Sequence, residues 1–491
     1  MSIRRNLISG SLWSIGASFT SLFSGFLVFS ILAHLLQPAE FGIVAFAAVF
    51  IEIAATFMTA GIPEALIQRE KWDETAASTA FWTSLVGSTL CAVVISAAGV
   101  WVILSGSSLL GAVIIALASG LIVDGARAVH EAKLRREFGY KVLALRTTTA
   151  KLSAGIVGVG LAYNGFGVWA LVVNRLVAAI LSAVIIWRAV PWRPRLVFSS
   201  GDLRQFGRFG GTLITAKMLG EITKRIPELA IGFVLGPVAL ASYRVGLRGL
   251  QFLISTTIRP LQVTALTALS RLQPAAVGEA YLRMTRATAL ISFPVFLGAA
   301  AIAPDFVVLC FGQKWASSAS VMAALALVVA PATLVYFAAP ALTAVGNTRL
   351  IVVSDIAQLL SSTLVVLIAV PFGIVAIAAG LTIRSHLTLP IVLLMLRKGV
   401  GLRVRRTATA LIGPGVAASF MAIAVTAARL FVLEDMGPLV RLLASAVLGS
   451  VIYVGLLLAF APRYTSETLL EFLPYLPPRL QRIGSRIVKR R

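Results

Sequence analysis

Residues 108–166 read SLLGAVIIALASGLIVDGARAVHEAKLRREFGYKVLALRTTTAKLSAGIVGVGLAYNGF. Two apolar segments, 108–125 and 143–163, flank a connection at 126–142 that carries most of the charged residues of this stretch. The turn at 163–166 that follows contains no Lys or Arg. A transmembrane helix needs about 20 mainly apolar residues, and an excess of Lys and Arg marks the cytoplasmic side of a membrane protein. The stretch therefore predicts two transmembrane helices that are joined on the cytoplasmic side.

The same alternation of basic and charge-poor connections continues along the chain. The basic connections are 63–78, 126–142, 188–208, 259–286 and 397–406. The intervening connections, which contain no Lys or Arg, are 37–40, 105–108, 163–166, 235–238 and 370–373. Both ends of the sequence are also basic, with Arg4 and Arg5 at one end and Lys489, Arg490 and Arg491 at the other. We therefore expect both termini in the cytoplasm, which requires an even number of spans.

Fourteen apolar segments are long enough to be spans. They lie near 12–35, 41–62, 79–104, 108–125, 143–163, 166–187, 207–235, 238–258, 286–310, 319–345, 349–369, 372–396, 408–432 and 439–461. The chain is 58% apolar and only 13% charged, whereas about a quarter of the residues of a soluble domain are charged. These features predict an all-α polytopic membrane protein with about 14 transmembrane helices and no soluble domain.

The net charge of +24 would suggest a nucleic-acid partner in a soluble protein. Here most of the basic residues lie in the predicted cytoplasmic connections, where they set the topology and contact anionic lipid. We therefore expect membrane lipids as partners and no nucleic acid.

The sequence carries no motif for catalysis or metal binding. It contains no G-x-x-x-x-G-K-[ST] phosphate-binding loop, and its three His residues do not have the spacing of metal ligands. Cys91 and Cys310 both lie inside predicted spans, so we expect no disulfide. The outward connections are too short for the carboxylate-bearing domain that a membrane polymerase or glycosyltransferase usually has. We expect no enzyme activity, no cofactor and no metal, and we look for function within the membrane-spanning helices.

An internal repeat divides the chain. The segment ILAHLLQPAEFGIVAF at 31–46 aligns with AIGFVLGPVALASYRV at 230–245, which places Pro38 on Pro237. Repeated halves are common in secondary transporters, whose substrate site lies where the halves meet. We predict two pseudo-symmetric six-helix lobes plus a C-terminal helix pair. The predicted boundaries are 1–190, 191–396, 397–461 for the helix pair, and 462–491 for a basic amphipathic cytoplasmic tail.

One predicted span, 207–235, is rich in charge. Its charged residues Lys217, Glu221, Lys224 and Glu228 are spaced by four, three and four, so they share one helix face, and Arg225 lies beside them. A charge at the centre of a bilayer costs at least about 3 kcal/mol, so these residues must pair with one another or line a wet cavity. A self-neutralised structural stripe and a cavity wall for a charged substrate both remain open. Arg244 and Arg248 on the next span make the group net positive, which favours the cavity wall.

Other ionisable and small residues also fall within spans. Lys151, Arg175 and Arg384 have few acidic neighbours in the sequence, and we add them to the predicted cavity set. The isolated acids Glu52 and Asp355 either carry a coupling ion or pair with a cavity arginine. A stripe of small residues in the first span either packs closely against another helix or forms a neutral cavity wall; it consists of Ser11, Ser14, Ser18, Ser21 and Gly25.

Several motifs resemble one transporter family. The stretches LAHLLQPAEFGIVAFAAVF at 32–50, GFGVWALV at 165–172, FGQKW at 311–315 and LRREFGYKVLALR at 134–146 are similar to those of the polysaccharide transporter (Wzx-type oligosaccharide flippase) family. That family belongs to the multidrug/oligosaccharidyl-lipid/polysaccharide exporter superfamily, which also holds multidrug extruders and lipid II flippases. The likeness covers roughly residues 5–460.

The resemblance implies two six-helix lobes around a central cavity and a location in the bacterial inner membrane. It implies that an undecaprenyl-diphosphate-linked oligosaccharide is flipped to the periplasmic leaflet by alternating access, for exopolysaccharide or lipopolysaccharide synthesis. A polysaccharide polymerase and a chain-length regulator would be its partners. The alternatives are a multidrug/cation antiporter of the same superfamily, whose cavity should carry net negative charge, and a membrane enzyme of polysaccharide assembly.

Overall fold

The computed structural model describes residues 20–59 and 61–460, and within them the chain is helical and has no strand. The helices of the first half are Thr20–Leu35, α2 (Pro38–Thr59), α3 (Ile62–Gln68), α4 (Glu74–Leu104), α5 (Ser108–Arg136), α6 (Tyr140–Tyr163), α7 (Val168–Ala189), α8 (Ser200–Ala230), the π-helical turn η1 (Ile231–Leu235) and α9 (Pro237–Thr257). Every span predicted in this half coincides with a helix.

The second half continues in the same way. Its elements are α10 (Arg259–Leu269), α11 (Pro274–Phe311), the 3-10 turn η2 (Gln313–Trp315), α12 (Ser317–Ala326), α13 (Val329–Ala344), α14 (Thr348–Ala369), the 3-10 turn η3 (Val370–Phe372), α15 (Ile374–Leu387), α16 (Leu389–Val400), α17 (Val404–Phe431) and α18 (Pro438–Phe460). Two predicted spans are broken helices. The span at 319–345 bends by 56° between α12 and α13, and the span at 372–396 is divided into α15 and α16.

Among the described residues, ten helices are long and apolar enough to cross a membrane, or eleven if the bent pair α12–α13 counts as one span. The predicted spans 207–235 and 238–258 are not among them, although α8 and α9 are present as helices. Both contain charged residues that lower their hydropathy. The all-helical membrane fold is therefore confirmed, and the count of fourteen spans stays a prediction.

Two basic connections are helical, which the sequence analysis did not predict. α5 runs through Arg136 and α11 begins at Pro274, so both extend beyond the apolar segments 108–125 and 286–310. With a rise of about 1.5 Å per residue, helices of 29 and 38 residues exceed the roughly 30 Å of a hydrocarbon core. Basic residues in the last turn of α5 also complement the negative end of the helix dipole.

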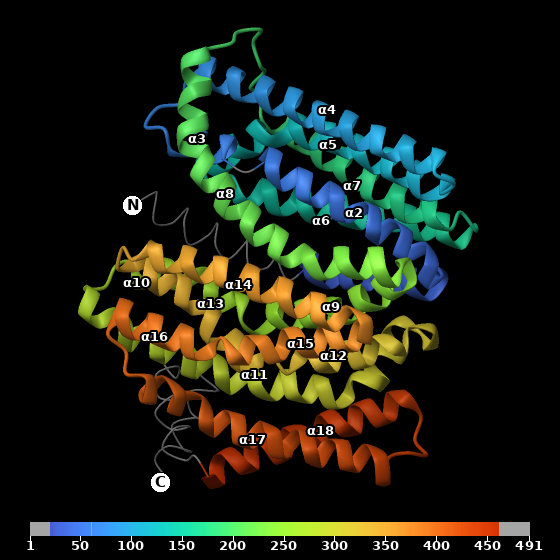
Figure 1. Cartoon of the computed structure of the whole chain (residues 1–491), viewed down its shortest axis with the longest axis vertical. Coiled ribbons are helices and arrows are strands. Elements are labelled where there is room, and N and C mark those ends of the chain that lie inside the picture. The colour runs from blue at the N-terminus through green and yellow to red at the C-terminus, as the bar shows by residue number, and fades with distance from the viewer. Residues whose placement is uncertain (1–19, 60, 461–491) are drawn as a thin grey trace. The chain divides into compact units, whose positions relative to one another are not determined.

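The chain packs into two compact units (Figure 1). Unit 1 comprises the described residues up to Arg244 together with Gln358–Ile374, and unit 2 comprises Val245–Ala357 together with the described residues from Val375 onward. The six-helix lobes predicted at 1–190 and 191–396 stay a prediction, as does the separate helix pair at 397–461. The predicted amphipathic tail at 462–491 lies outside the described residues.

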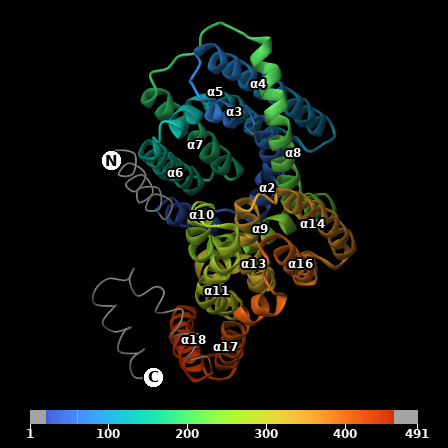
Figure 2. The ribbon, with the colours of Figure 1, turned by 90° about the vertical axis from the view of Figure 1, so that its left-hand side faces the viewer.

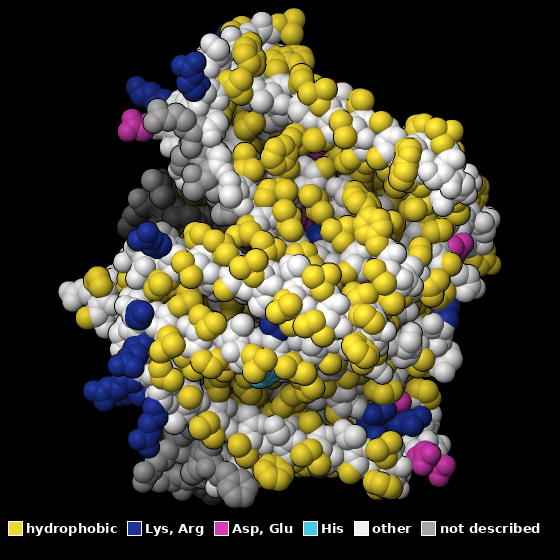
Figure 3. Space-filling model, viewed as in Figure 1, with side chains coloured by type: hydrophobic (Ala, Val, Ile, Leu, Met, Phe, Trp, Pro, Cys, Tyr) yellow, Lys and Arg dark blue, Asp and Glu magenta, His cyan; other side chains and the backbone are white. Residues whose placement is uncertain are grey.

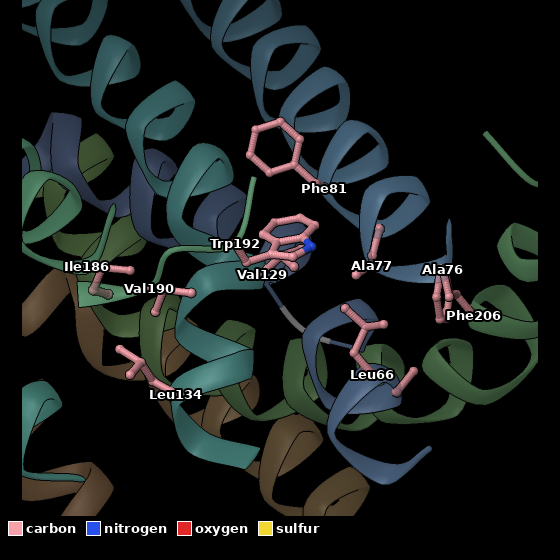
Figure 4. Packing of buried hydrophobic residues seen from close by; sticks show 12 residues of the cluster. Leu66, Ala76, Ala77, Phe81, Val129, Leu134, Ile186, Val190, Trp192 and Phe206 are labelled. Atoms are coloured by element: carbon pink, nitrogen blue, oxygen red, sulfur yellow. The ribbon is translucent and has the colours of Figure 1, made fainter. Parts of the chain in front are cut away.

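A hydrophobic cluster holds one end of unit 1 together. Leu66 of α3, Phe81 of α4 and Val129 of α5 pack with Trp192, which lies in the connection between α7 and α8 (Figure 4). The Trp192 indole nitrogen donates a hydrogen bond to Glu74 Oε2 at 2.7 Å, which satisfies the polar atom of this buried ring. This packing fixes the connection that leads into α8.

The helices α2 and α8 are also held together near the outward turns of the repeat. A Cβ atom on Gly42 of α2 would lie 2.1 Å from the carbonyl oxygen of Pro237, so only glycine fits there. One turn further along α2, the ring of Phe46 fills the space beside Gly232 of η1. The turns at Pro38 and Pro237 therefore lie side by side, as expected if both are on the same side of the membrane.

Unit 2 is built around α11, which packs against α12, α13, α17 and α18. The consecutive helices α17 and α18 run antiparallel (Figures 1 and 2). Asp305 of α11 accepts from Arg429 Nε of α17 at 2.7 Å and lies 3.3 Å from Arg441 Nε of α18. Hydrophobic side chains cover much of the unit 2 face in view, while Lys and Arg gather near the ends of α10 and α16 (Figure 3).

Candidate functional site

The charged face predicted on span 207–235 lies on α8, in unit 1. Helix α8 lies beside α2, α3 and α4. Its charged side chains form two groups. One group, toward the end of α8, joins residues of α2, α7 and α9, and the other ties the first part of α8 to α3.

Arg225 is the centre of the first group. Its Nη1 atom lies 2.8 Å from Glu52 Oε2 of α2 and 3.0 Å from Glu228 Oε2, and its Nε atom donates to Glu221 Oε1 at 2.7 Å. The spacings of four and three residues place both α8 carboxylates on the helix face of Arg225. The pairing of Glu221 with Arg225 follows the spacing that the sequence showed.

Two further arginines complete the group. The side chain of Glu228 is only 3% exposed and accepts from Arg244 of α9, at 2.5 Å from Nη2 and 3.1 Å from Nε. Arg175 of α7 lies 3.2 Å from Glu52 Oε1, and Arg244 lies 3.6 Å from Glu52 Oε2. We call the six residues the central ion-pair cluster: Glu52, Arg175, Glu221, Arg225, Glu228 and Arg244.

The central ion-pair cluster is electrically balanced, which corrects one expectation. The sequence analysis expected a net positive group with Lys217 and Arg248. The structure instead brings three carboxylates to three arginines, because Glu52 of α2 joins the group. Each arginine contacts at least one carboxylate, and Glu52 contacts all three arginines. Such a network satisfies its charges internally and offers several alternative pairings.

Lys217 belongs to the second group. Its ammonium group pairs with Glu64 of α3. Nearer the start of α8, Asp202 pairs with Arg69, which follows α3. Burial raises the pKa of the Asp202 carboxyl, but hydrogen bonds from Arg69 and Ser199 outweigh it, so its pKa lies below its ordinary value. These contacts fix α8 against α3, and the sequence analysis did not find them because it had singled out neither Glu64 nor Asp202.

The remaining predicted site residues lie elsewhere. Lys224 is 73% exposed and 3.8 Å from Glu221. Lys151 of α6 donates to the Ser21 hydroxyl at 2.9 Å, so this residue of the small-residue stripe has a polar contact; Ser11, Ser14 and Ser18 lie outside the described residues. Arg248, Asp355 and Arg384 belong to unit 2, where Arg384 donates to the Ser385 hydroxyl at 3.1 Å. The structure does not test their predicted role.

The chemistry of the central ion-pair cluster is recognition of anions. Guanidinium groups bind carboxylate and phosphate oxygens through paired N–H donors. Within the described part of the chain, no group of three His, Cys, Asp or Glu side chains is placed to hold a metal ion. The cluster can therefore exchange its internal carboxylates for the oxygens of an anionic ligand.

Comparison with known proteins gives the family and the fold. The family model described as polysaccharide biosynthesis protein matches residues 31–320, which is more than half of the chain. The teichuronic acid biosynthesis protein TuaB of Bacillus subtilis (strain 168) is 22% identical over 339 residues, or 67% of this chain and 69% of that protein. The lipopolysaccharide biosynthesis protein WzxC of Escherichia coli (strain K12) is also 22% identical over 339 residues, or 67% of this chain and 68% of that protein.

A solved structure of the lipid II flippase MurJ, in an inward closed conformation, matches the fold. The TM-score is 0.74 at 13% sequence identity, over 93% of this chain and 99% of that chain. The arrangement of helices is therefore that of MurJ.

Proposed function

The chain belongs to the polysaccharide biosynthesis protein family, and from this premise we propose that it is a flippase for lipid-linked oligosaccharides. The proposed substrate is an undecaprenyl-diphosphate-linked unit of an exopolysaccharide or lipopolysaccharide. It moves from the cytoplasmic to the periplasmic leaflet of the inner membrane by alternating access. The MurJ-like fold supports this proposal, because the solved structure that it resembles is titled as that of a lipid flippase.

The observation that carries the proposal is the central ion-pair cluster. Arg175, Arg225 and Arg244 lie on apolar or predicted membrane-spanning helices, where an uncompensated charge is costly. In a protein without bound substrate, Glu52, Glu221 and Glu228 compensate them. A diphosphate brings equivalent oxygens and about two negative charges. It can therefore replace carboxylates as the partner of the same guanidinium groups.

Glu52 is the carboxylate best placed to exchange. It contacts all three arginines, and its side chain is 31% exposed, whereas that of Glu228 is 3% exposed. When a diphosphate takes its place, Glu52 loses the cations that keep it ionised, and it takes up a proton. Proton uptake at Glu52 would couple substrate binding to the proton gradient, a role that the sequence analysis left open for Glu52 and for Asp355.

The alternatives fit less well. A multidrug/cation antiporter should offer net negative charge to its substrate, but this cluster has as many arginines as carboxylates. A membrane enzyme of polysaccharide assembly usually carries a large polar loop, and the predicted outward connections are short. Transport of an anionic lipid therefore has the better support.

Complementation of a deletion strain tests the proposal. We expect Arg225→Gln to lower export at least tenfold at normal membrane abundance, because the diphosphate loses its central guanidinium partner. The lipid-linked intermediate should accumulate, and its extraction from the membrane measures the block. The matched control is Lys224→Gln, which removes a neighbouring but 73% exposed cation of the same helix and should export normally.

The triple variant Lys217→Ala, Lys224→Ala, Arg225→Ala decides the matter. Normal export by this variant at normal abundance would mean that the α8 charges are structural. Arg175 and the predicted cations Lys151, Arg248 and Arg384 would then be the next candidates for the diphosphate.

A further inference from the structure

Unit 1 contains a second charged site, separate from the central ion-pair cluster. A cavity of about 340 Å³ lies between α3, α5, the start of α6 and α8, and seven of its eleven lining residues are charged. Its walls come from the connections 63–78 and 126–142, whose basic residues predict the cytoplasmic side. Ligand pockets start at about 300 Å³, so the cavity can hold a small polar group but not a whole lipid.

One carboxylate in the wall is shared by three guanidinium groups. Glu131 of α5 lies 2.8 Å from Arg127 Nη1, 2.5 Å from Arg135 Nη2 and 2.7 Å from Arg146 Nη1. Arg127 also pairs with Asp124 at 2.8 Å. The spacing of four between Arg127, Glu131 and Arg135 places these residues on one face of α5, and Arg146 reaches the same carboxylate from α6.

The charges of this wall do not balance. The three arginines are opposed by Glu131 and Asp124, which leaves one positive charge in excess. Lys217 and Glu64, also in the wall, cancel each other. The Nε atom of Arg146 is buried and has no hydrogen-bond partner among the described residues. Arg135 is 51% exposed, so it can turn toward a ligand without disturbing buried packing.

The excess charge and the donors indicate which ligand fits. A phosphate ester supplies one or two negative charges and several acceptor oxygens, which suit the planar donors of arginine. Anionic lipid headgroups also concentrate at the cytoplasmic surface, where the topology places the cavity. We propose that this cavity is a phosphate-binding site that takes the phosphate group of a membrane lipid or of an isoprenyl diphosphate. Glu131 occupies the arginines until the phosphate arrives.

The proposal makes an unusual prediction for Glu131. A carboxylate that competes with the ligand lowers affinity, so Glu131→Gln should tighten phosphate binding several-fold. Arg135→Gln and Arg146→Gln should each weaken it at least tenfold. A residue that only held the fold together would not change affinity in opposite directions. The matched control is Arg406→Gln in unit 2, since Arg406 is exposed and pairs with the single carboxylate Glu279.

Calorimetric titration of the purified full-length protein tests the site, without any transport step. The probes are inorganic pyrophosphate and dihexanoyl phosphatidylglycerol, with dihexanoyl phosphatidylcholine as the zwitterionic comparison. Saturable binding of pyrophosphate identifies a diphosphate source, and binding of phosphatidylglycerol identifies a lipid headgroup. Both support the site if Arg135→Gln and Arg146→Gln weaken the binding.

The proposal is overturned if neither probe binds, or if binding is unchanged in both arginine variants. Should Arg146→Gln fail to fold, Arg135→Gln decides alone, because its half-exposed side chain is dispensable for packing. The outcome is independent of the flippase assignment. A protein that exports normally but binds neither probe loses only this site, and one that binds but does not export loses only the proposed function.

Discussion

Unit 1 and unit 2 both place arginines against carboxylates inside a helical bundle, but the two groups are built differently. In unit 2, Asp305 pairs with Arg429 and Arg441, and Arg429 Nη1 also donates to the Ala301 carbonyl at 2.5 Å. The side chains of Asp305 and Arg429 are only 8% and 10% exposed. We call Asp305, Arg429 and Arg441 the unit 2 triad.

The central ion-pair cluster of unit 1 is more open and has alternative partners. Glu52 and Arg175 are 31% and 40% exposed, and Arg225 contacts three carboxylates. Removing one carboxylate from the cluster leaves others in place, whereas removing Asp305 leaves two arginines without a carboxylate. The difference indicates that the unit 2 triad holds helices together and that the cluster can rearrange around a ligand.

The largest expected effect is therefore in unit 2. Asp305→Ala should lower the free energy of unfolding by about 3–5 kcal/mol, because it leaves buried charges uncompensated. Chemical denaturation of the purified protein measures this loss. The control is Glu279→Ala, also on α11, whose exposed pair with Arg406 should contribute about 0.2–1 kcal/mol. Equal losses for the two variants would show that burial of the unit 2 triad is unimportant.

Arg429→Lys should have the next largest effect. Lysine keeps the charge but cannot place donors on both Asp305 and the Ala301 carbonyl as the guanidinium does. An unsatisfied buried group costs about 1–3 kcal/mol. The same denaturation assay should find a smaller loss for Arg225→Lys, since several carboxylates surround that position. A larger loss for Arg225→Lys would reverse the comparison.

Glu221→Ala should cost about 1 kcal/mol, which is the net value of a typical hydrogen bond. Arg225 keeps Glu52 and Glu228 as partners, so its charge remains compensated. We expect a modest fall in membrane abundance, measured by quantitative blotting beside Asp305→Ala. An equally severe fall in both variants would mean that the cluster is as fixed as the unit 2 triad.

The smallest effect is expected for Lys224→Gln. The lysine is 73% exposed and lies 3.8 Å from its nearest carboxylate, so the change in unfolding free energy should be within about 0.5 kcal/mol. Denaturation and export should both match the unchanged protein. A marked loss of export with normal stability would add Lys224 to the substrate-binding residues.

The sequence predicted the helices well and the site only in part. Hydrophobic length located every helix that became a predicted span, because burial in lipid is a property of each segment alone. Pairs within one helix, such as Glu221 with Arg225, follow from spacing. The pairing of Glu52 with Arg175 joins residues 123 positions apart, and no local pattern specifies it.

The same limit explains the wrong expectation of a net positive group. The charge of a site depends on which distant acids reach it, and Glu52 and Glu64 come from α2 and α3. The spacing of Arg127, Glu131 and Arg135 was visible in the sequence. It was interpreted only as part of a basic connection, because the helical extension of α5 was not predicted.

The contact between Gly42 and Pro237 has a mechanical consequence. Backbone meets backbone there, with no side chain between them that could change rotamer to absorb a displacement. A rotation of α8 at this end would therefore carry α2 with it, as two rods pinned at one point. Any opening within unit 1 must take place at the other end of α8, where only side-chain ion pairs to Glu64 and Arg69 hold it. The pinned end is the fulcrum and the charged end is the arm that moves.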